Sequence, residues 1–294
     1  MLELRGLSRR FGEITAVDDV SFDVPSGEMV GFVGGNGAGK TTTMRMIMGV
    51  LQPSAGEVFW QGQPASRAVR SRFGYMPEER GLYPKQPVLG QLVYLGRLHG
   101  MSASAARQRA QELLERFGLG ERSGDKLESL SLGNQQRAQI IAAVLGDPVA
   151  LILDEPFSGL DPTAVDQMAA LLREHTAAGV PVLFSSHQLE LVDRLCDRLV
   201  VLHRGRVVAN GTADELRGQA PVRYRLVLGG DAGWVHAAPG VRVVESDATS
   251  AVVEPENEDA VQRLLTEAVS RGPVRELARV VPTLSEIYRE VASV

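Results

Sequence analysis

The sequence predicts an α/β fold followed by a smaller α+β segment, and two patterns carry this prediction. In the first part of the chain, short apolar runs such as Val149–Leu153 and Val180–Ser185 alternate with stretches of helical periodicity such as 163–178. Continuous apolar runs of this kind are typical of parallel strands that helices cover on both faces. Towards the C-terminus, residues alternate at period two around one amphipathic helix, 257–271. At 294 residues, the chain is long enough for one large and one small domain.

The first part of the chain begins with a β-rich segment. Residues 1–33 alternate apolar and polar side chains and end in the apolar run Met29–Val33, and another short strand is expected at 56–62. Residues 88–118 are expected to be helical, because apolar side chains recur there on one face. The run Val200–Val208 is expected to form a hairpin that turns at Arg204-Gly205.

A turn-forming segment, Gly218-Gln219-Ala220-Pro221, separates the two parts. We therefore expect one domain over residues 1–218 and a small α+β domain over 219–294. The second domain is expected to end in a helix that begins with a capping box, in which Thr283 and Glu286 satisfy each other's free main-chain N–H groups.

Composition and charge restrict the classes of partner. The chain is 44% hydrophobic and 23% charged with a net charge of −5, which gives no sign of a nucleic acid as the main partner. Its single cysteine excludes an internal disulfide. The sequence lacks both an apolar run of transmembrane length and a signal-peptide core, so we expect that this chain does not cross a membrane by itself.

The strongest local signal is the stretch from Gly34 to Thr41, which matches the phosphate-binding pattern G-x-x-x-x-G-K-[ST]. It follows an apolar strand and opens a helical run, so main-chain N–H groups and the positive end of a helix dipole can face phosphate oxygens. Lys40 is expected to reach the β- and γ-phosphates and Thr41 to hold Mg²⁺. A glycine-rich turn without a ligand is the alternative. The candidate nucleotide-binding residues are Gly34, Asn36, Gly37, Ala38, Gly39, Lys40, Thr41 and Thr42.

Two acidic residues follow the apolar strand Val149–Leu153. Asp154 ends this strand, where a buried carboxylate needs a partner, and Mg²⁺ is the natural one. Glu155 comes next, and a second carboxylate that the metal does not use is suited to activating a water molecule. The alternative is that the pair merely caps a helix.

The segment Leu130-Ser131-Leu132-Gly133-Asn134-Gln135-Gln136-Arg137 makes the interpretation specific. Ser131 and Gly133 would open a helix whose N-terminus can approach a phosphate, although a serine N-cap on an ordinary helix is the alternative. The segment resembles the L-S-x-G-x-Q-Q-R signature of ATP-binding cassette (ABC) ATPases, and it lies ahead of Asp154-Glu155 as it does in that family.

This resemblance covers residues 1–217 and implies the ABC ATPase fold, with a mixed-sheet core, an antiparallel β subdomain and a helical subdomain at about 85–135. It also implies a homodimer with two shared ATP sites. Further roles follow from it: Ser131, Gly133 and Gln135 contact the partner's ATP, Glu155, His187 and Lys40 are catalytic, Asp161 links the two sites, and Phe11 stacks on adenine. Core packing is the alternative for Phe11.

Glu78 departs from the usual family pattern. Most members carry a glutamine after the strand, where this chain has Gly74-Tyr75-Met76-Pro77-Glu78. An ionised glutamate offers only acceptors, whereas glutamine also donates, so Glu78 is expected to join Thr41 and Asp154 at the metal. The stretch Pro77–Tyr83 resembles a branch of ABC exporters that pair with ABC-2-type membrane subunits.

The C-terminal domain looks like the extension found on drug, sodium or antibiotic export ATPases of that branch. The resemblance therefore implies a Mg²⁺-dependent ATPase that powers an exporter through a separate membrane permease, on the cytoplasmic face of the cell membrane. Two alternatives remain open. One is a soluble ABC ATPase that acts on nucleic acid or the ribosome, and the other is an importer ATPase with a regulatory C-terminal domain. The sequence does not indicate the transported substrate.

Overall fold

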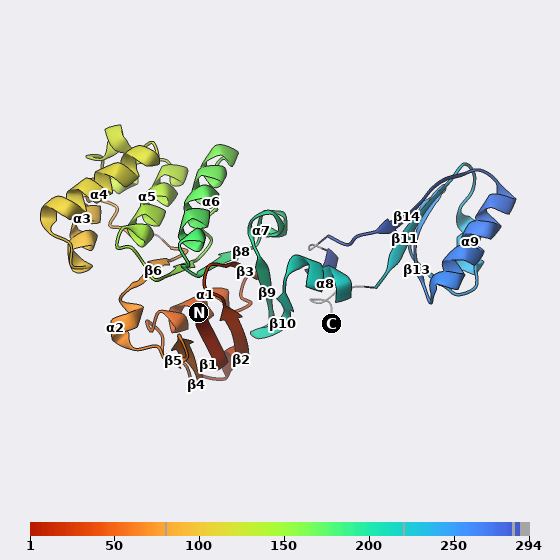
Figure 1. The fold of residues 1–294 in the computed structure, drawn as a ribbon, viewed down its shortest axis with the longest axis horizontal. Helices are drawn as coiled ribbons and strands as arrows, with labels where there is room; N and C mark the ends of the chain where they lie inside the picture. Colours follow the sequence, from red (N-terminus) through yellow and green to blue (C-terminus); the bar gives the residue numbers. More distant parts are fainter. Residues whose placement is uncertain (80, 220, 284–285, 289–294) are drawn as a thin grey trace. The chain divides into compact units, whose positions relative to one another are not determined.

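The computed structural model describes residues 1–79, 81–219, 221–283 and 286–288. Two compact units, Met1–Ala213 and Asp214–Glu290, divide the chain, and Figure 1 shows their elements. The turn expected at Gly218 is instead the end of a short helix, α8 (Ala213–Gln219). In the described part of the chain, no helix has both the length and the apolar character needed to span a membrane.

A six-stranded sheet forms the centre of the first unit, with the strand order β10-β9-β3-β8-β7-β6. All neighbouring pairs are parallel except the hairpin of β9 and β10, so the predicted α/β fold with a mixed sheet is confirmed. Arg204 and Gly205 form the turn of this hairpin, both with positive φ. The strands are β3 (Met29–Val33), β6 (Phe73–Met76), β7 (Ala150–Leu153), β8 (Val182–Ser186), β9 (Arg198–His203) and β10 (Arg206–Gly211).

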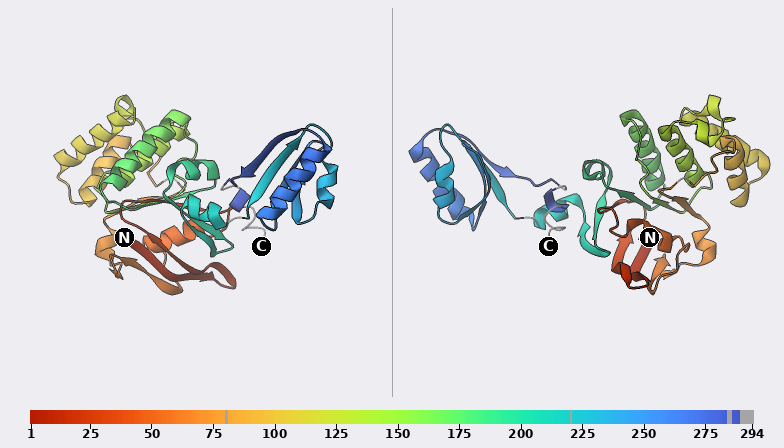
Figure 2. Two further views of the ribbon diagram at one scale, coloured as in Figure 1. Left: turned by 45° about the vertical axis from the view of Figure 1, so that its right-hand side comes forward. Right: turned by 180° about the vertical axis from the view of Figure 1, so that it is seen from behind.

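Every residue of β3, β7 and β8 is buried, which explains why their sequences are largely apolar, with Ser185 and Ser186 at the end of β8 as the polar exceptions. The helices α5 (Leu132–Val144), α6 (Pro162–Ala177) and α7 (Leu189–Leu195) pack on the sheet, as Figure 2 shows. A core cluster that includes Met44, Met46 and Ile47 of α1 (Lys40–Ile47) joins the sheet to the antiparallel β subdomain. Its strands are β1 (Leu2–Phe11), β2 (Ile14–Val24), β4 (Ala55–Trp60) and β5 (Gln63–Pro64).

The stretch 88–118 is helical as expected, and it is divided into two helices, α3 (Val88–Leu98) and α4 (Ala103–Arg116). Gly100 adopts φ +91°, which a helix does not allow, and the Ser102 hydroxyl accepts the N–H of Ala105 to cap the second helix. Both helices contact α5. A short helix, α2 (Arg67–Arg70), precedes β6.

The second unit is a small α+β fold with the antiparallel strand order β12-β13-β11-β14. This is the split β-α-β arrangement, with the first helix reduced to a 3-10 turn at Gly233–Ala237. The capping box is present, since Thr283 and Glu286 bond each other's N–H groups, whereas residues 284 and 285 between them lie outside the described residues. The remaining elements are β11 (Arg223–Leu228), β12 (Val241–Ser246), β13 (Ser250–Pro255), α9 (Glu258–Arg271) and β14 (Val274–Val280).

One glycine tests how tightly α5 packs on the sheet. A Cβ at Gly74, on β6, would clash with the main-chain oxygen of Ala143 on α5, which cannot move aside as a flexible side chain could. We expect Gly74→Ala to destabilise the first unit by about 1–3 kcal/mol, seen as a lower midpoint of thermal unfolding. Gly124→Ala is the control, because no described atom beyond its two chain neighbours lies within 4 Å of its added Cβ. Equal midpoints for both variants would contradict the close packing.

Candidate active site

Four segments that lie far apart in the sequence meet at one edge of the central sheet. The Gly34–Thr41 loop follows β3, His187 follows β8, Asp154 follows β7, and Glu78 comes shortly after β6. These strands are consecutive neighbours in the order β3-β8-β7-β6 and run parallel. Since parallel strands present their carboxyl ends at the same edge, the sheet itself gathers these side chains.

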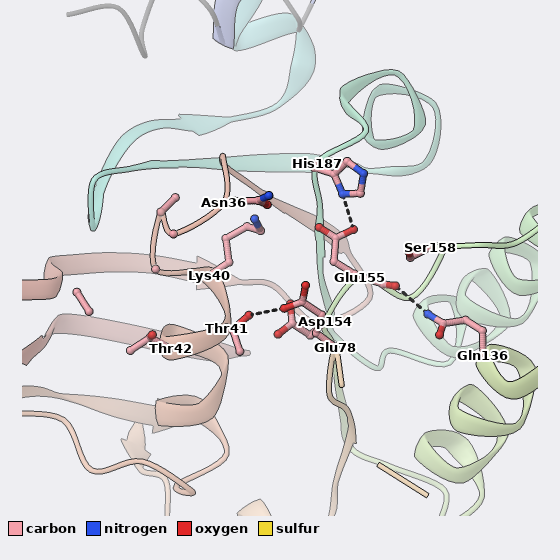
Figure 3. A pocket seen from close by; sticks show the side chains of 14 residues that line it. Asn36, Lys40, Thr41, Thr42, Glu78, Gln136, Asp154, Glu155, Ser158 and His187 are labelled. Carbon is pink, nitrogen blue, oxygen red and sulfur yellow. Dashed lines mark hydrogen bonds and ion pairs between the residues drawn. The ribbon is translucent and has the colours of Figure 1, made fainter. Parts of the chain in front are cut away.

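The gathered residues line a cavity of about 490 Å³, which Figure 3 shows from close by. Most of the candidate site residues are among them. The lining residues are Ala16, Asn36, Gly37, Ala38, Gly39, Lys40, Thr41, Thr42, Glu78, Gln136, Asp154, Glu155, Ser158 and His187.

The glycine-rich loop forms a cradle for an anion. Gly37 and Gly39 have φ of +76° and +108°, and a Cβ at Gly39 would lie 2.6 Å from the main-chain oxygen of Ala16. Helix α1 begins directly after Gly39, which leaves main-chain N–H groups of its first turn to face a ligand. Lys40 is buried, and its Nζ donates to the carbonyl of Gly34 at 2.8 Å, so the loop holds the ammonium in place.

Asp154 is 1% exposed, and one of its two carboxylate oxygens has a hydrogen-bond partner among the described residues. Its Oδ1 accepts the hydroxyl of Ser185 at 2.6 Å, whereas Oδ2 is buried without a hydrogen-bond partner among the described residues. A buried carboxylate oxygen in this state fits a divalent cation. Burial, helped by the Asp154 carboxylate, also raises the pKa of Tyr75 on β6, so that phenol stays neutral.

Thr41 and Glu78 supply further oxygens beside Asp154. The Thr41 hydroxyl donates to Oε2 of Glu78 at 3.3 Å, as Figure 3 shows. In the described part of the chain, no cluster of three His, Cys, Asp or Glu side chains could hold a metal by itself. The set therefore suits Mg²⁺, which takes one or two carboxylates together with phosphate oxygens and water.

Glu155 is held from three sides. Its N–H donates to Ser185 Oγ at 2.8 Å, its carbonyl accepts Gln136 Nε2 at 2.8 Å, and its Oε2 lies 3.0 Å from Nδ1 of His187. Figure 3 shows the last two contacts. Its φ of +52° is uncommon for a residue with a Cβ, so these bonds fix an unfavourable main chain. The carboxylate is consequently directed at the cavity in one orientation.

Apart from Gln136, the signature segment 130–137 lies outside this cavity. Ser131 is exposed and caps α5, because its hydroxyl accepts the N–H of Asn134, and Leu132 beside it is 66% exposed. Gly133 is partly exposed at the same helix end. Gln135 is buried, and its amide donates to the carbonyl of Leu130 at 2.8 Å, so it supports the segment from inside.

Phe11 and Asp161 also lie outside the lining residues. Phe11 is 46% exposed and stacks under the Arg9 guanidinium, so the alternative of core packing does not hold. Asp161 caps α6 by accepting the N–H of Ala164, and its second oxygen accepts from Arg137 at 3.4 Å.

Two residues that contact Glu155 were not identified from the sequence. Gln136 belongs to the signature segment, but its spacing does not reveal that its amide reaches the carbonyls of Glu155 and Pro156. Ser185 is a polar residue at the end of an otherwise apolar run, and this is the one local feature of the sequence that distinguishes it.

Comparison with known proteins defines the class. Residues 17–158 match the ABC transporter family model, and residues 211–292 match the C-terminal domain of DrrA1-3-like ATP-binding proteins. The ABC transporter ATP-binding protein YhaQ of Bacillus subtilis is 39% identical over 99% of this chain and 98% of its own length. The linearmycin resistance ATP-binding protein LnrL of the same organism is 34% identical over 74% of this chain and 70% of its own length.

Solved structures of ABC transporter cassettes agree with this class. The ATP-binding subunit of an ABC transporter superposes with a TM-score of 0.69 at 36% identity, covering 74% of this chain and 92% of that one. A dimeric bacterial ABC transporter cassette gives 0.66 at 25% identity, covering 72% and 98%. The chain belongs to the ATP-binding subunits of ABC transporters. It is an ATPase, and its ligands are ATP and Mg²⁺.

Glu78 is the carboxylate that departs from the family pattern, and its contact with Thr41 suggests a test. Glu78→Gln removes one anionic oxygen beside Asp154. We expect ATP hydrolysis to persist while the Mg²⁺ concentration for half-maximal activity rises, measured by titrating Mg²⁺ at fixed ATP. The neighbouring, exposed Glu79→Gln is the control. An unchanged Mg²⁺ titration would exclude the metal contact.

Proposed function

We propose that two copies of this chain form a homodimer that encloses two ATP molecules, and that this dimer powers an exporter through a separate membrane permease. The exposed signature carries the first part of the proposal. Ser131 and Gly133 lie outside the chain's own cavity and are accessible at the end of α5, where a second copy could use them. A dimeric cassette among the structural relatives supports the same arrangement.

The proposed roles follow from the geometry of the cavity. Lys40 and the N–H groups of the loop bind the phosphates, with contributions from Asn36 and Thr42. Thr41, Asp154 and Glu78 hold Mg²⁺, which neutralises charge on the phosphates when bound. Phe11 lies outside the cavity lining and is proposed to contact adenine.

Hydrolysis needs a base and a fixed water. Glu155 is proposed to accept the proton from the attacking water at Oε1, since Oε2 is engaged by His187. His187 holds the carboxylate in this orientation. Ser131 and Gly133 of the partner close the site, Gln135 supports them through Leu130, and Asp161 links the two sites.

The permease is proposed to dock on a groove in the helical subdomain. The groove has a volume of about 620 Å³ and lies between the segment 81–87 and α3. Tyr83, Tyr94 and Leu98 are exposed along it, and exposed apolar surface of this kind is typical of an interface. The segment begins three residues after Glu78, so a docked permease would lie close in sequence to the metal site.

Export, rather than import, is supported by the names of the relatives. One of them is the Nod factor export ATP-binding protein I of Burkholderia lata, 39% identical over 73% of this chain and 72% of its own length. We further propose that residues 1–218 are the ATPase domain, that 219–294 are a separate domain, and that the dimer works in the cytoplasm at the inner face of the cell membrane.

The role of Glu155 gives the most direct test of the chemistry. We expect Glu155→Gln to lower kcat by about 10²-fold or more, because an amide cannot accept the proton, while ATP binding is retained. Turnover is measured by phosphate release and binding by calorimetry. Glu190→Gln, at an exposed position on α7, is the control. Turnover near that of the wild type would contradict the assignment.

The docking groove gives a second test. We expect Tyr94→Asp and Leu98→Asp to abolish co-purification of a polytopic membrane protein, without changing the ATPase activity of the isolated chain. Val50→Asp, at another exposed apolar position, is the control. Co-purification of ribosomes instead of a membrane protein would contradict the proposed function.

A further inference from the structure

A single buried hydroxyl connects the two acidic residues of the cavity. Ser185 lies on β8 and is 0% exposed. Its Oγ lies 2.6 Å from Oδ1 of Asp154 and 2.8 Å from the main-chain nitrogen of Glu155. The parallel register pairs Leu153 with Phe184, which brings the next residue of each strand together at the edge of the sheet.

The direction of both hydrogen bonds is fixed by their chemistry. A main-chain N–H can only donate, so Ser185 Oγ accepts the bond from Glu155. The hydroxyl has one hydrogen, and that hydrogen is left for the carboxylate of Asp154. A distance of 2.6 Å is typical of a hydroxyl that donates to an ionised carboxylate. Ser185 Oγ is therefore the acceptor in the bond from Glu155 and the donor in the bond to Asp154.

For Asp154, this contact fixes the orientation of the carboxylate. The bond from Ser185 occupies Oδ1, whereas Oδ2 stays buried without a partner among the described residues. The terminal torsion of an aspartate is broad and could otherwise turn either oxygen towards the cavity. The hydroxyl restricts this torsion, so one oxygen of the carboxylate is held by Ser185 and the other is left available for a metal.

For Glu155, the same hydroxyl holds an unfavourable main chain. The residue has a φ of +52°, in the left-handed region that residues with a Cβ seldom adopt. Its N–H is held by Ser185 and its carbonyl by Gln136, one on each side of the strained residue. This conformation directs the Glu155 carboxylate to His187.

We propose that Ser185 is a positioning residue for ATP hydrolysis, whose one hydroxyl sets both the orientation of the Asp154 carboxylate and the main chain of Glu155. Ser185 is fully buried and does not line the cavity, so it acts through these two residues. The metal site and the proton acceptor are therefore aligned by one atom. The inference rests on the roles that are proposed above for Asp154 and Glu155.

The test compares three substitutions at Ser185 in the full chain. Ser185→Ala removes the hydroxyl, Ser185→Cys keeps the shape with a weak donor, and Ser185→Thr restores the hydroxyl. Ser186→Ala is the matched control, because Ser186 is buried next to it but its hydroxyl accepts the N–H of Gln188. The readouts are kcat, KM for ATP, thermal unfolding, and Mn²⁺ affinity by electron paramagnetic resonance with a non-hydrolysable ATP analogue.

We expect Ser185→Ala and Ser185→Cys to lower kcat and to weaken Mn²⁺ binding, each by about 10–100-fold, as is common when a group that orients a metal ligand is lost. KM for ATP stays close to that of the wild type, since the phosphate loop is untouched. Ser185→Thr recovers both quantities, and Ser186→Ala keeps them. If Ser185→Ala does not fold, Ser185→Cys carries the same expectation.

Two results would overturn the proposal. One is wild-type kcat and Mn²⁺ affinity in folded Ser185→Ala or Ser185→Cys, and the other is an equal loss in Ser186→Ala. Glu155→Gln is measured alongside them. If Glu155→Gln loses turnover while the Ser185 variants do not, only the role of Ser185 is wrong; if Glu155→Gln keeps turnover, the proposed role of Glu155 itself is wrong.

Discussion

The shared direction of β3, β8, β7 and β6 is the constraint on which the rest of the site depends. Parallel strands end at one edge, so the loops that follow them cannot lie far apart. β3, β7 and β8 are fully buried and β6 is mostly buried, so packing on both faces holds the ends of these strands in place. Asp154 is held in this way: it is the first residue after β7 and has β6 and β8 on either side. The positions of the site residues are thus set mainly by the sheet, and the loops that follow the strands adjust them.

The charge distribution in the cavity explains why it needs a cation with its nucleotide. The carboxylates of Glu78, Asp154 and Glu155 line it. Among the described residues that line it, Lys40 is the one lysine, and there is no arginine. The phosphates of ATP add further negative charge, so binding them here without compensation would be costly. A divalent ion bound beside these carboxylates would relieve part of this repulsion. The remaining relief comes from the loop N–H groups and from the partner's signature in the proposed dimer.

Much of this arrangement could be predicted from the sequence, because the motifs are local. The loop at Gly34–Thr41 needs glycine at positions of positive φ, and a carboxylate at the end of an apolar strand needs a partner, so both features can be recognised within a few residues. Contacts between distant segments could not be predicted in this way. Ser185 looks like one polar residue in a strand until its register with β7 is known. The break at Gly100 was missed because apolar residues keep a helical spacing on both sides of it.

Gln136 connects the exposed signature segment to the main chain of Glu155 within one helix. Helix α5 begins at the exposed signature and, through Gln136, also holds the main chain of Glu155 and Pro156. In the proposed dimer, the helix that a chain extends to its partner's nucleotide is thus the one that holds its own proton acceptor. A displacement of this helix cannot alter one site and leave the other unchanged. The two ATP sites of the dimer would then be coupled, and their turnovers would be correlated rather than independent.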